Sequence, residues 1–347
     1  MAKNNFGSRL RFFSYVKCVV LLTLNTFVFS CNDGAELGNS IQEVVTDLEI
    51  PWSIDFLPDG RMVFTQRPGI VSVHSNGQIT EIARVDVEHN GEGGLLGIAV
   101  DPDFNQNSYT YLYYTYQNGE IFNRIARFTF NDSLTDQTIL IDSIPGASIH
   151  NGGRIRFGPD GLLYATTGDA NNPDFSGDTF SLAGKILRLK NDGSVPDDNP
   201  FGNYIYAMGL RNPQGLSWRG DTLYASSHGP MRHDEIHRIE RGMDYRWPQT
   251  CDETGLAMRC YTEFTLAPSG IQVVDDQLYV TGLRGNQLRR IDLLTGQEES
   301  LLTDLGRLRD VVLHNSMLYI ATSNRDGRGV PGAGDDKIVR VDPADLK

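Results

Sequence analysis

The chain has 347 residues and a formal net charge of −13. A strongly acidic surface is repelled by nucleic acid, so we expect no nucleic-acid partner. With 39% hydrophobic and 22% charged residues, the composition is typical of a folded globular protein, and the length allows one large domain or two.

Residues 1–30 have the pattern of an export signal. An apolar run follows a start that contains no acid and four basic residues, Lys3, Arg9, Arg11 and Lys17. Polar residues interrupt this run, which is too short for a membrane span. Val28-Phe29-Ser30-Cys31 resembles a bacterial lipobox. We therefore expect a lipid on Cys31, a short linker over residues 31–40, and a place in the periplasm or cell envelope with no other membrane contact.

Loss of the signal would change both the charge and the cysteine count. Without its four positive charges, the net charge falls from −13 to −17. Cys18 would also leave, so the exported chain beyond Cys31 would keep Cys251 and Cys260. In an oxidising compartment these two are expected to form a disulfide across a loop. Two free buried thiols are the alternative.

Six related segments follow one another from residue 41 onward. The clearest copies are Ile54–Phe64 and Ile155–Tyr164, which share a strand, a Pro-Asp-Gly turn and a second strand. Weaker copies begin at Gly97, Gly215, Gly270 and Asp310. Some are followed by a third strand pattern, as at Gly184–Leu189.

Six units of roughly 40–60 residues, each made of short strands, predict an all-β fold, a six-bladed β-propeller over residues 41–347. The strand expected at Gln42–Leu48 would complete the last blade and close the ring. No sustained helical period is present, which argues against an α/β fold. Long inserts between strands are often functional, and three are expected, at 171–182, 191–204 and 241–266.

His150 and Asp169 are the first candidate pair. His150 stands before Asn151-Gly152-Gly153, where the chain enters a hairpin, and Asp169 ends the second strand of that hairpin. A carboxylate that orients an imidazole makes it a general base. The alternative is that both residues only cap the hairpin.

A set of polar residues lies near the ends of later repeat units, where propeller loops face one mouth. It consists of Arg211, Asn212, Arg284, Arg307 and Arg309. Arginines gathered in an acidic protein indicate a small ligand with several negative charges, because guanidinium binds carboxylates in a bidentate way. The alternative is ordinary ion pairs with neighbours such as Asp310. Arg61 and Arg67, in the first unit, are expected outside this mouth.

Gly229 and Pro230 form the third candidate feature, together with Asp234. Backbone carbonyls and a carboxylate in one loop suit calcium, which prefers oxygen ligands. Such loops are also common as plain turns.

Long motifs in a fixed order give the chain a family resemblance over about Ile50–Pro343. It resembles the soluble aldose sugar dehydrogenases, relatives of the soluble quinoprotein glucose dehydrogenase, which use pyrroloquinoline quinone (PQQ) and calcium on a six-bladed propeller. The motifs include Pro51-Trp52-Ser53, Gly91–Gly97, Asp101–Phe104, His150–Asp169, Leu182–Arg188, Asp198–Phe201, Arg211–Gly215, Asp244–Pro248 and Arg307–Asp310.

The resemblance implies an oxidoreductase that converts aldose sugars to lactones by hydride transfer from C1 to PQQ, with an unidentified electron acceptor. His150 matches the base and Asp169 its partner. Gly229 and Pro230 match main-chain calcium ligands. The residues that match groups holding the PQQ carboxylates and quinone are Arg211, Asn212, Arg284, Arg307 and Arg309.

Four positions depart from relatives and affect the sugar contacts most. Leu210 stands where a histidine is usual, and His228 lies in the Ser-Ser-His-Gly-Pro loop. Ile149 replaces an acid that precedes the base in the glucose dehydrogenases, and Glu92, a candidate sugar contact, replaces a glutamine.

Two other functions remain as alternatives. A calcium-dependent lactonase would need acidic or Asn ligands converging from several blades, whereas the polar set here is dominated by arginines. A non-catalytic surface-binding propeller would not need His150 with three late arginines, although fold alone does not decide function.

Overall fold

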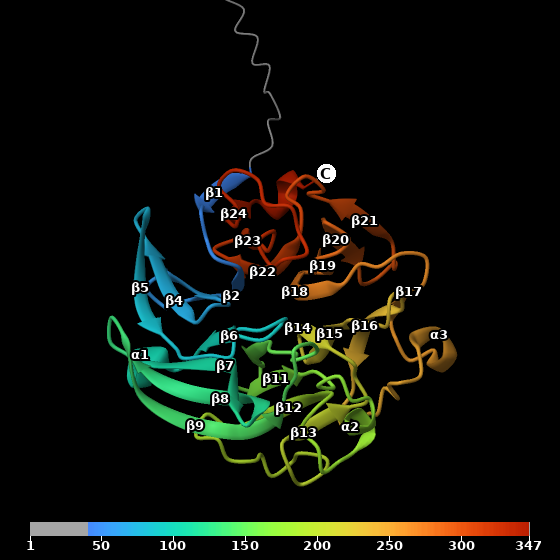
Figure 1. The fold of residues 1–347 in the computed structure, drawn as a ribbon. Coiled ribbons are helices and arrows are strands. Elements are labelled where there is room, and N and C mark those ends of the chain that lie inside the picture. The colour runs from blue at the N-terminus through green and yellow to red at the C-terminus, as the bar shows by residue number, and fades with distance from the viewer. Residues whose placement is uncertain (1–40, 347) are drawn as a thin grey trace, which may run out of the picture. The chain divides into compact units, whose positions relative to one another are not determined.

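The computed structural model describes residues 41–346, which form the predicted six-bladed β-propeller (Figure 1). Each blade is a four-stranded antiparallel sheet, and successive blades follow one another around the ring. The expected export signal, the linker and Cys31 lie outside the described residues.

The first three blades occupy the N-terminal part of this region. Blade 1 contains β2 (Pro51–Phe56), β3 (Met62–Gln66), β4 (Ile70–Ser75) and β5 (Gln78–Arg84). Blade 2 contains β6 (Leu95–Val100), β7 (Tyr109–Asn118), β8 (Glu120–Phe130) and β9 (Leu134–Pro145). Blade 3 contains β10 (Ile155–Phe157), β11 (Leu163–Thr167), β12 (Lys185–Leu189) and β13 (Ile205–Met208).

The remaining three blades complete the ring. Blade 4 contains β14 (Pro213–Arg219), β15 (Thr222–Ser227), β16 (Asp234–Ile239) and β17 (Arg259–Tyr261). Blade 5 contains β18 (Pro268–Val274), β19 (Gln277–Gly282), β20 (Gln287–Asp292) and β21 (Glu298–Leu301). Blade 6 contains β22 (Leu308–His314), β23 (Met317–Thr322), β24 (Ile338–Val341) and β1 (Gln42–Val45).

The N-terminal strand closes the ring as expected. β1 pairs antiparallel with β24, with Gln42 opposite Arg340, and so supplies the outer strand of the last blade (Figure 1). The two ends of the propeller are therefore joined by backbone hydrogen bonds, which leave no gap between the first and the last sequence repeat.

Helices are short in the described region. They are α1 (Phe104–Asn107), α2 (Asp174–Gly177), α3 (Cys251–Thr254) and the 3-10 helix η1 (Pro343–Asp345). Over residues 41–346, no helix has the length and apolar character that a membrane crossing requires.

The Pro-Asp-Gly sequences form the tight turns that the repeats predict. In blade 1 the Leu57 amide donates to Arg61 O, the Gly60 amide donates to Leu57 O, and Gly60 has φ +87°. Blade 3 repeats this arrangement with Gly158 and Leu162. A left-handed residue after Pro-Asp is favourable only for glycine, which explains why the motif recurs.

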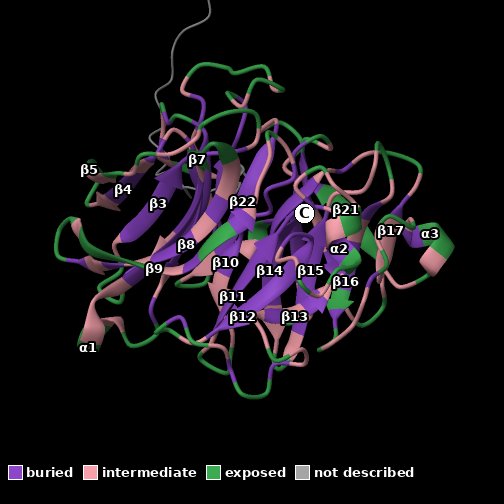
Figure 2. Cartoon of the chain, turned by 60° about the horizontal axis from the view of Figure 1, so that its bottom comes forward, coloured by how far each residue is buried: buried purple, intermediate pink, exposed green. Residues whose placement is uncertain are grey.

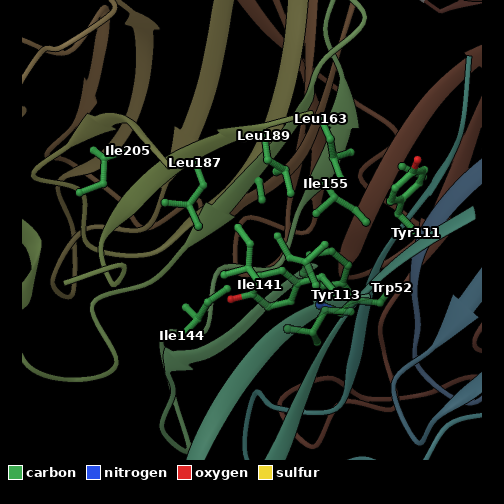
Figure 3. Packing of buried hydrophobic residues seen from close by; sticks show 14 residues of the cluster. Trp52, Tyr111, Tyr113, Ile141, Ile144, Ile155, Leu163, Leu187, Leu189 and Ile205 are labelled. Atoms are coloured by element: carbon green, nitrogen blue, oxygen red, sulfur yellow. The ribbon is translucent and has the colours of Figure 1, made fainter. Parts of the chain in front are cut away.

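Apolar side chains pack between neighbouring blades. One cluster joins blades 2 and 3 and includes Tyr113, Ile144 and Leu187, together with Trp52 of β2 (Figure 3). Figure 2 shows that strands such as β14 are buried, whereas the loops at the periphery are exposed. Close approach of the inner strands also requires glycine: a Cβ on Gly97 would lie 2.3 Å from Gly153 O.

The predicted disulfide is confirmed between Cys251 and Cys260. It ties α3 to β17, the outer strand of blade 4, and bounds part of the long insert after residue 240. A ring this short stabilises the fold by about 2–3 kcal/mol at best.

A buried ion pair crosses the inner strands of the ring. Asp310 of β22 is fully buried, and its Oδ2 accepts hydrogen bonds from Arg154 Nη1 at 2.8 Å and from the Ile54 amide at 2.9 Å. Arg156 contacts the same oxygen at 3.3 Å. The Arg154 guanidinium also donates to Ser53 Oγ and to Gln214 O, so blades 1, 3, 4 and 6 meet at this group.

Asp310→Asn is expected to destabilise the propeller strongly. The change leaves the Arg154 guanidinium, of which 1% is exposed, without its counter-ion, and breaking such a buried pair costs about 3–5 kcal/mol. Asp276→Asn is the matched control, because Asp276 pairs with Arg219 at a surface site. Urea unfolding gives the free energy of unfolding of both variants. Equal losses in the two variants would show that the central pair has no special role.

Candidate functional site

One cavity of about 480 Å³ brings together six of the ten predicted site residues. We call it the outer cavity; it is lined by Glu92, His150, Arg211, Gly229, Arg284 and Arg307, among others. Its volume is within the range of small-molecule sites. Asp169 and Asn212 lie behind this lining, Pro230 adjoins it, and Arg309 lines a separate, deeper space described below.

His150 and Asp169 form the pair that the sequence predicts. His150 Nδ1 lies 2.7 Å from Asp169 Oδ1, and Asp169 Oδ2 accepts a hydrogen bond from Trp247 Nε1 at 2.8 Å. The Asn171 amide also donates to Asp169. Because an ionised carboxylate can only accept, the shared hydrogen belongs to Nδ1, which leaves the lone pair of Nε2 for the outer cavity.

The backbone holds His150 in an unusual conformation. Its φ is +61°, a left-handed value that is uncommon for a residue with a side chain. Its amide donates to Glu92 Oε2 at 3.0 Å, and its carbonyl accepts from the Ala170 amide at 3.2 Å. A Cβ on Gly168 would lie 1.9 Å from that carbonyl, so only glycine allows this approach.

Glu92 is a fixed negative charge at the wall of the outer cavity. Burial alone would raise its pKa, but His228 in its protonated form, the His150 amide and Arg328 together lower the pKa to about 2. Burial lowers the pKa of His228 to about 3, so His228 is uncharged at neutral pH. The His150 amide and Arg328, which donates to Glu92 Oε1 at 2.7 Å, therefore keep Glu92 ionised there.

Arg211 and Asn212 have different environments. The Arg211 guanidinium lines the outer cavity, donates to Gly229 O at 3.0 Å and lies 5.4 Å from the centre of the Trp247 ring. Asn212 is fully buried; its Oδ1 accepts from the Gly152 amide, and its Nδ2 donates to Glu92. Asn212 thus supports the loop after His150 rather than the cavity wall.

The late arginines divide between two spaces. Arg284 is exposed and lines the outer cavity, and its side chain makes no hydrogen bond or ion pair within residues 41–346. Arg307 also lines the outer cavity but is paired with Asp326 at 2.7 Å. Arg309 lies in the deeper space, where its Nη1 donates to Gln214 at 2.7 Å. The expected ion-pair partner Asp310 binds Arg154 and Arg156 instead.

The deeper space, which we call the inner chamber, contains a residue that the sequence prediction placed elsewhere. Arg67 lines it, so the expectation that Arg67 lies outside the mouth is wrong. The repeat pattern could have located it, because Arg67 directly follows the second strand of blade 1, as His228 does in blade 4 and Leu283 in blade 5. All three line the inner chamber.

Trp247 and Arg328 were also missed as individual residues. Both lie in loops whose course repeat periodicity does not determine. Of the three long inserts, 171–182 follows Asp169 and 241–266 carries Trp247, so both reach the site. The insert at 191–204 joins the far ends of β12 and β13 instead.

The Gly229–Pro230 loop is closed by its own hydrogen bonds. Gly229 O accepts from Arg211, and Pro230 O accepts from the Arg232 amide. Asp234 accepts from three backbone amides, those of Gly229, Leu266 and Ala267, so its oxygens brace the loop. Among the residues that the structure describes, no three His, Cys, Asp or Glu side chains gather as a metal-binding group.

Volume alone does not identify the site. A cavity of about 570 Å³ lies between blades 1 and 2 and is lined by residues such as Arg84, Tyr116 and Arg124. It contains neither the histidine–aspartate pair nor the gathered arginines, so the outer cavity is the better candidate.

The comparisons agree with this choice. The family model described as Glucose / Sorbosone dehydrogenase matches residues 48–331. The chain is 31% identical over 282 residues to quinoprotein glucose dehydrogenase B of Acinetobacter calcoaceticus, covering 66% of this chain and 58% of that protein. It is 34% identical over 226 residues to the aldose sugar dehydrogenase YliI of Escherichia coli, covering 59% and 61%. The matched region thus spans less than two thirds of both curated relatives.

A solved structure shares nearly the whole fold. The PQQ-bound form of aldose sugar dehydrogenase from Streptomyces coelicolor superimposes with a TM-score of 0.80 and 35% sequence identity. The alignment covers 88% of this chain and 98% of that one.

Glu92→Gln is expected to lower stability in a pH-dependent way. The pKa of Glu92 is about 2 in the folded chain against an ordinary 4.5, so its contribution is present above pH 4.5 and is lost as the pH falls towards 2. The free energy of unfolding should drop by at most about 3 kcal/mol at pH 7, less the part that protonated His228 contributes only at low pH, and the difference between variant and wild type should narrow below pH 4.5. Urea unfolding at several pH values measures it. Glu263→Gln, at an exposed position, is the control; a gap that stays constant with pH would contradict the account.

Proposed function

Because the chain belongs to the glucose/sorbosone dehydrogenase family, we propose that it oxidises aldose sugars at C1 to lactones with PQQ as electron acceptor. The observation that carries this proposal is the juxtaposition of the His150–Asp169 pair with a cluster of arginines in one cavity. The first provides a base, and the second provides a place for an anionic cofactor.

The charges of the outer cavity suit a tricarboxylate. Its lining includes the arginines 211, 284, 307 and 328, against two acids, Glu92 and Asp234. The Asp234 carboxylate is already held by the backbone amides of Gly229, Leu266 and Ala267. The unpaired guanidinium of Arg284 and the partly free one of Arg211 offer donors to carboxylates. We infer that Arg211, Arg284 and Arg307 hold PQQ, while Asn212 and Arg309 support it from behind.

His150 Nε2 is the base in this account. The Asp169 carboxylate fixes the proton on Nδ1, and Trp247 and the Asn171 amide fix the carboxylate, so Nε2 faces the cavity in one orientation. There it accepts the proton of the C1 hydroxyl as the C1–H bond breaks. When bound, PQQ supplies an acceptor for the hydride equivalent from C1.

Glu92 and Arg328 are proposed to position the sugar. They form a pair at 2.7 Å beside His150, and both line the outer cavity. A carboxylate accepts and a guanidinium donates, so together they can bind two neighbouring sugar hydroxyls. Leu210 is fully buried and makes no contribution to the wall.

We also propose that calcium binds at the Gly229–Pro230 loop, on the condition that the cofactor supplies some of its ligands. The Gly229 and Pro230 carbonyls, both engaged in hydrogen bonds here, are neutral ligands, and Asp234 is occupied by three amides. The chain therefore offers a calcium ion an incomplete site that oxygens of the cofactor would have to complete. Gly229 O already accepts a hydrogen bond from Arg211, so the ion would have to use the second lone pair of this oxygen or displace the guanidinium.

The alternatives are less well supported. A lactonase would need several side-chain ligands for calcium, and the described residues bring no such acidic group together. A surface-binding propeller would need no buried base, whereas His150 is 7% exposed and oriented by a carboxylate of which 1% is exposed.

Replacing the base should abolish sugar oxidation without loss of the fold. His150→Ala should slow single-turnover reduction of bound PQQ by glucose roughly 10²–10⁴-fold, the range for a positioned general base. Asp169→Asn should slow it less, because the ring is misoriented but present. Absorbance of the cofactor measures both rates, and far-ultraviolet circular dichroism checks the fold. A wild-type rate in His150→Ala would exclude this residue as the base.

Calcium and PQQ should bind with positive coupling. The protein site is completed by the cofactor, so each should raise the affinity for the other by the same factor. Isothermal titration of PQQ into the chelator-treated protein, with and without calcium, measures that factor. The control is magnesium, which demands stricter octahedral geometry. Identical PQQ affinity in the presence and absence of calcium would remove calcium from the proposal.

A further inference from the structure

Arg67 is a buried cation without a partner among the residues that the structure describes. The residue is 7% exposed, and its side chain makes no hydrogen bond or ion pair with any other residue between 41 and 346. Burial lowers its pKa, and the nearby charges of Asp326 and Glu92 only partly oppose this effect. Buried charged groups are normally paired, so such a guanidinium indicates a group that the protein itself does not provide.

The inner chamber is the space that this guanidinium lines. Its volume is about 20 Å³, enough for one water-sized species but too small for a tricyclic cofactor or a sugar. Arg67 and Arg309 line the inner chamber and not the outer cavity, whereas Arg211, Arg284 and Arg307 line only the outer cavity. The two spaces share Glu92, His228, Leu283 and Arg328, which form the boundary between them.

Hydrogen-bond donors exceed acceptors in the inner chamber. Within the described part of the chain, the Nε atoms of Arg67 and Arg309 are both buried and unpaired. The two carboxylates nearby are occupied. Asp326 binds Arg307 and the Arg328 amide and lies 3.6 Å from Arg309 Nη2, and Glu92 binds Arg328 and the His150 amide. The Gln214 Oε1 atom already accepts from Arg309 Nη1. A donor-rich, positively charged space of this size matches a small anion.

We propose that the inner chamber binds one monovalent anion of halide size on the free Nε–H groups of Arg67 and Arg309. The anion would neutralise the unpaired guanidinium and supply the acceptor that both groups lack. It would lie beneath the outer cavity, close to the Trp52 ring, which is 5.8 Å from the Arg309 guanidinium carbon. Because Arg309 also supports the proposed cofactor, the anion would lie behind the cofactor, at a site that is already present in the cofactor-free protein.

A water molecule is the competing occupant. Water would accept hydrogen bonds from the same two Nε–H groups but would leave the positive charge in place. The two occupants therefore differ in one measurable respect: only an anion makes stability depend on the identity of the salt at constant ionic strength.

The test uses the cofactor-free protein with sodium gluconate replaced stepwise by sodium chloride at constant ionic strength. We expect Tm to rise with the logarithm of the chloride concentration above the Kd, by about 2–4 °C at ten times the Kd. Crystals grown in sodium bromide should show one anomalous peak in the inner chamber. Both effects should disappear in Arg67→Gln and persist in Arg61→Gln, a partly exposed arginine of the same blade that pairs with Asp59.

The stability of Arg67→Gln in the two salts distinguishes anion binding by Arg67 from a purely structural role. Because an unpaired buried charge is unfavourable, Arg67→Gln should be at least as stable as the wild type in gluconate and less stable only in chloride. Equal wild-type Tm in both salts together with an empty anomalous map would overturn the proposal in favour of water. Displacement of bromide by PQQ in equal amounts would also overturn it, because the chamber would then be part of the cofactor site. The wild-type Tm series and the wild-type anomalous map test the proposal even if Arg67→Gln fails to fold.

Discussion

The Asp310 carboxylate is the group on which the centre of the propeller depends. It is fully buried in blade 6, yet it binds the amide of Ile54 in blade 1 and Arg154, which lies just before the first strand of blade 3. Both members of the ion pair adjoin site residues in the sequence. Arg309 directly precedes Asp310, and Arg154 directly follows the loop that begins at His150. The ion pair therefore positions both the cavity wall and the base, in addition to joining blades that are not adjacent.

The base is organised by backbone geometry as much as by side chains. The positive φ of His150 is possible because Glu92 accepts its amide hydrogen and Gly168 allows its carbonyl to approach closely. Such strain is commonly found at functional sites, where surrounding contacts over-determine one conformation. Glu92 consequently connects the base to Arg328. The loop before β6, which carries Glu92, and the loop after β23, which carries Arg328, therefore both help to hold His150.

The fold could be predicted from the sequence because it follows from repeats, and the histidine–aspartate pair could be predicted as a candidate because both residues stand at the ends of one hairpin. Pro-Asp-Gly turns recur at each clear copy, and Asp169 ends a strand that His150 precedes. The division of the arginines could not be predicted. Arg307 and Arg309 are two residues apart and would share one side of a regular strand, but the pairing register shifts between Leu308 and Asp310. Arg307 therefore lines the outer cavity and Arg309 the inner chamber.

The central claim is that this chain removes hydrogen from C1 of a sugar. The most direct measurement is the reduction of PQQ in the reconstituted protein by glucose that carries deuterium at C1, compared with unlabelled glucose in single-turnover experiments. The account predicts reduction that is several-fold slower with deuterium, because the C1–H bond breaks in the chemical step. Absence of PQQ reduction, or reduction at the same rate with both sugars at saturating concentration, would contradict it.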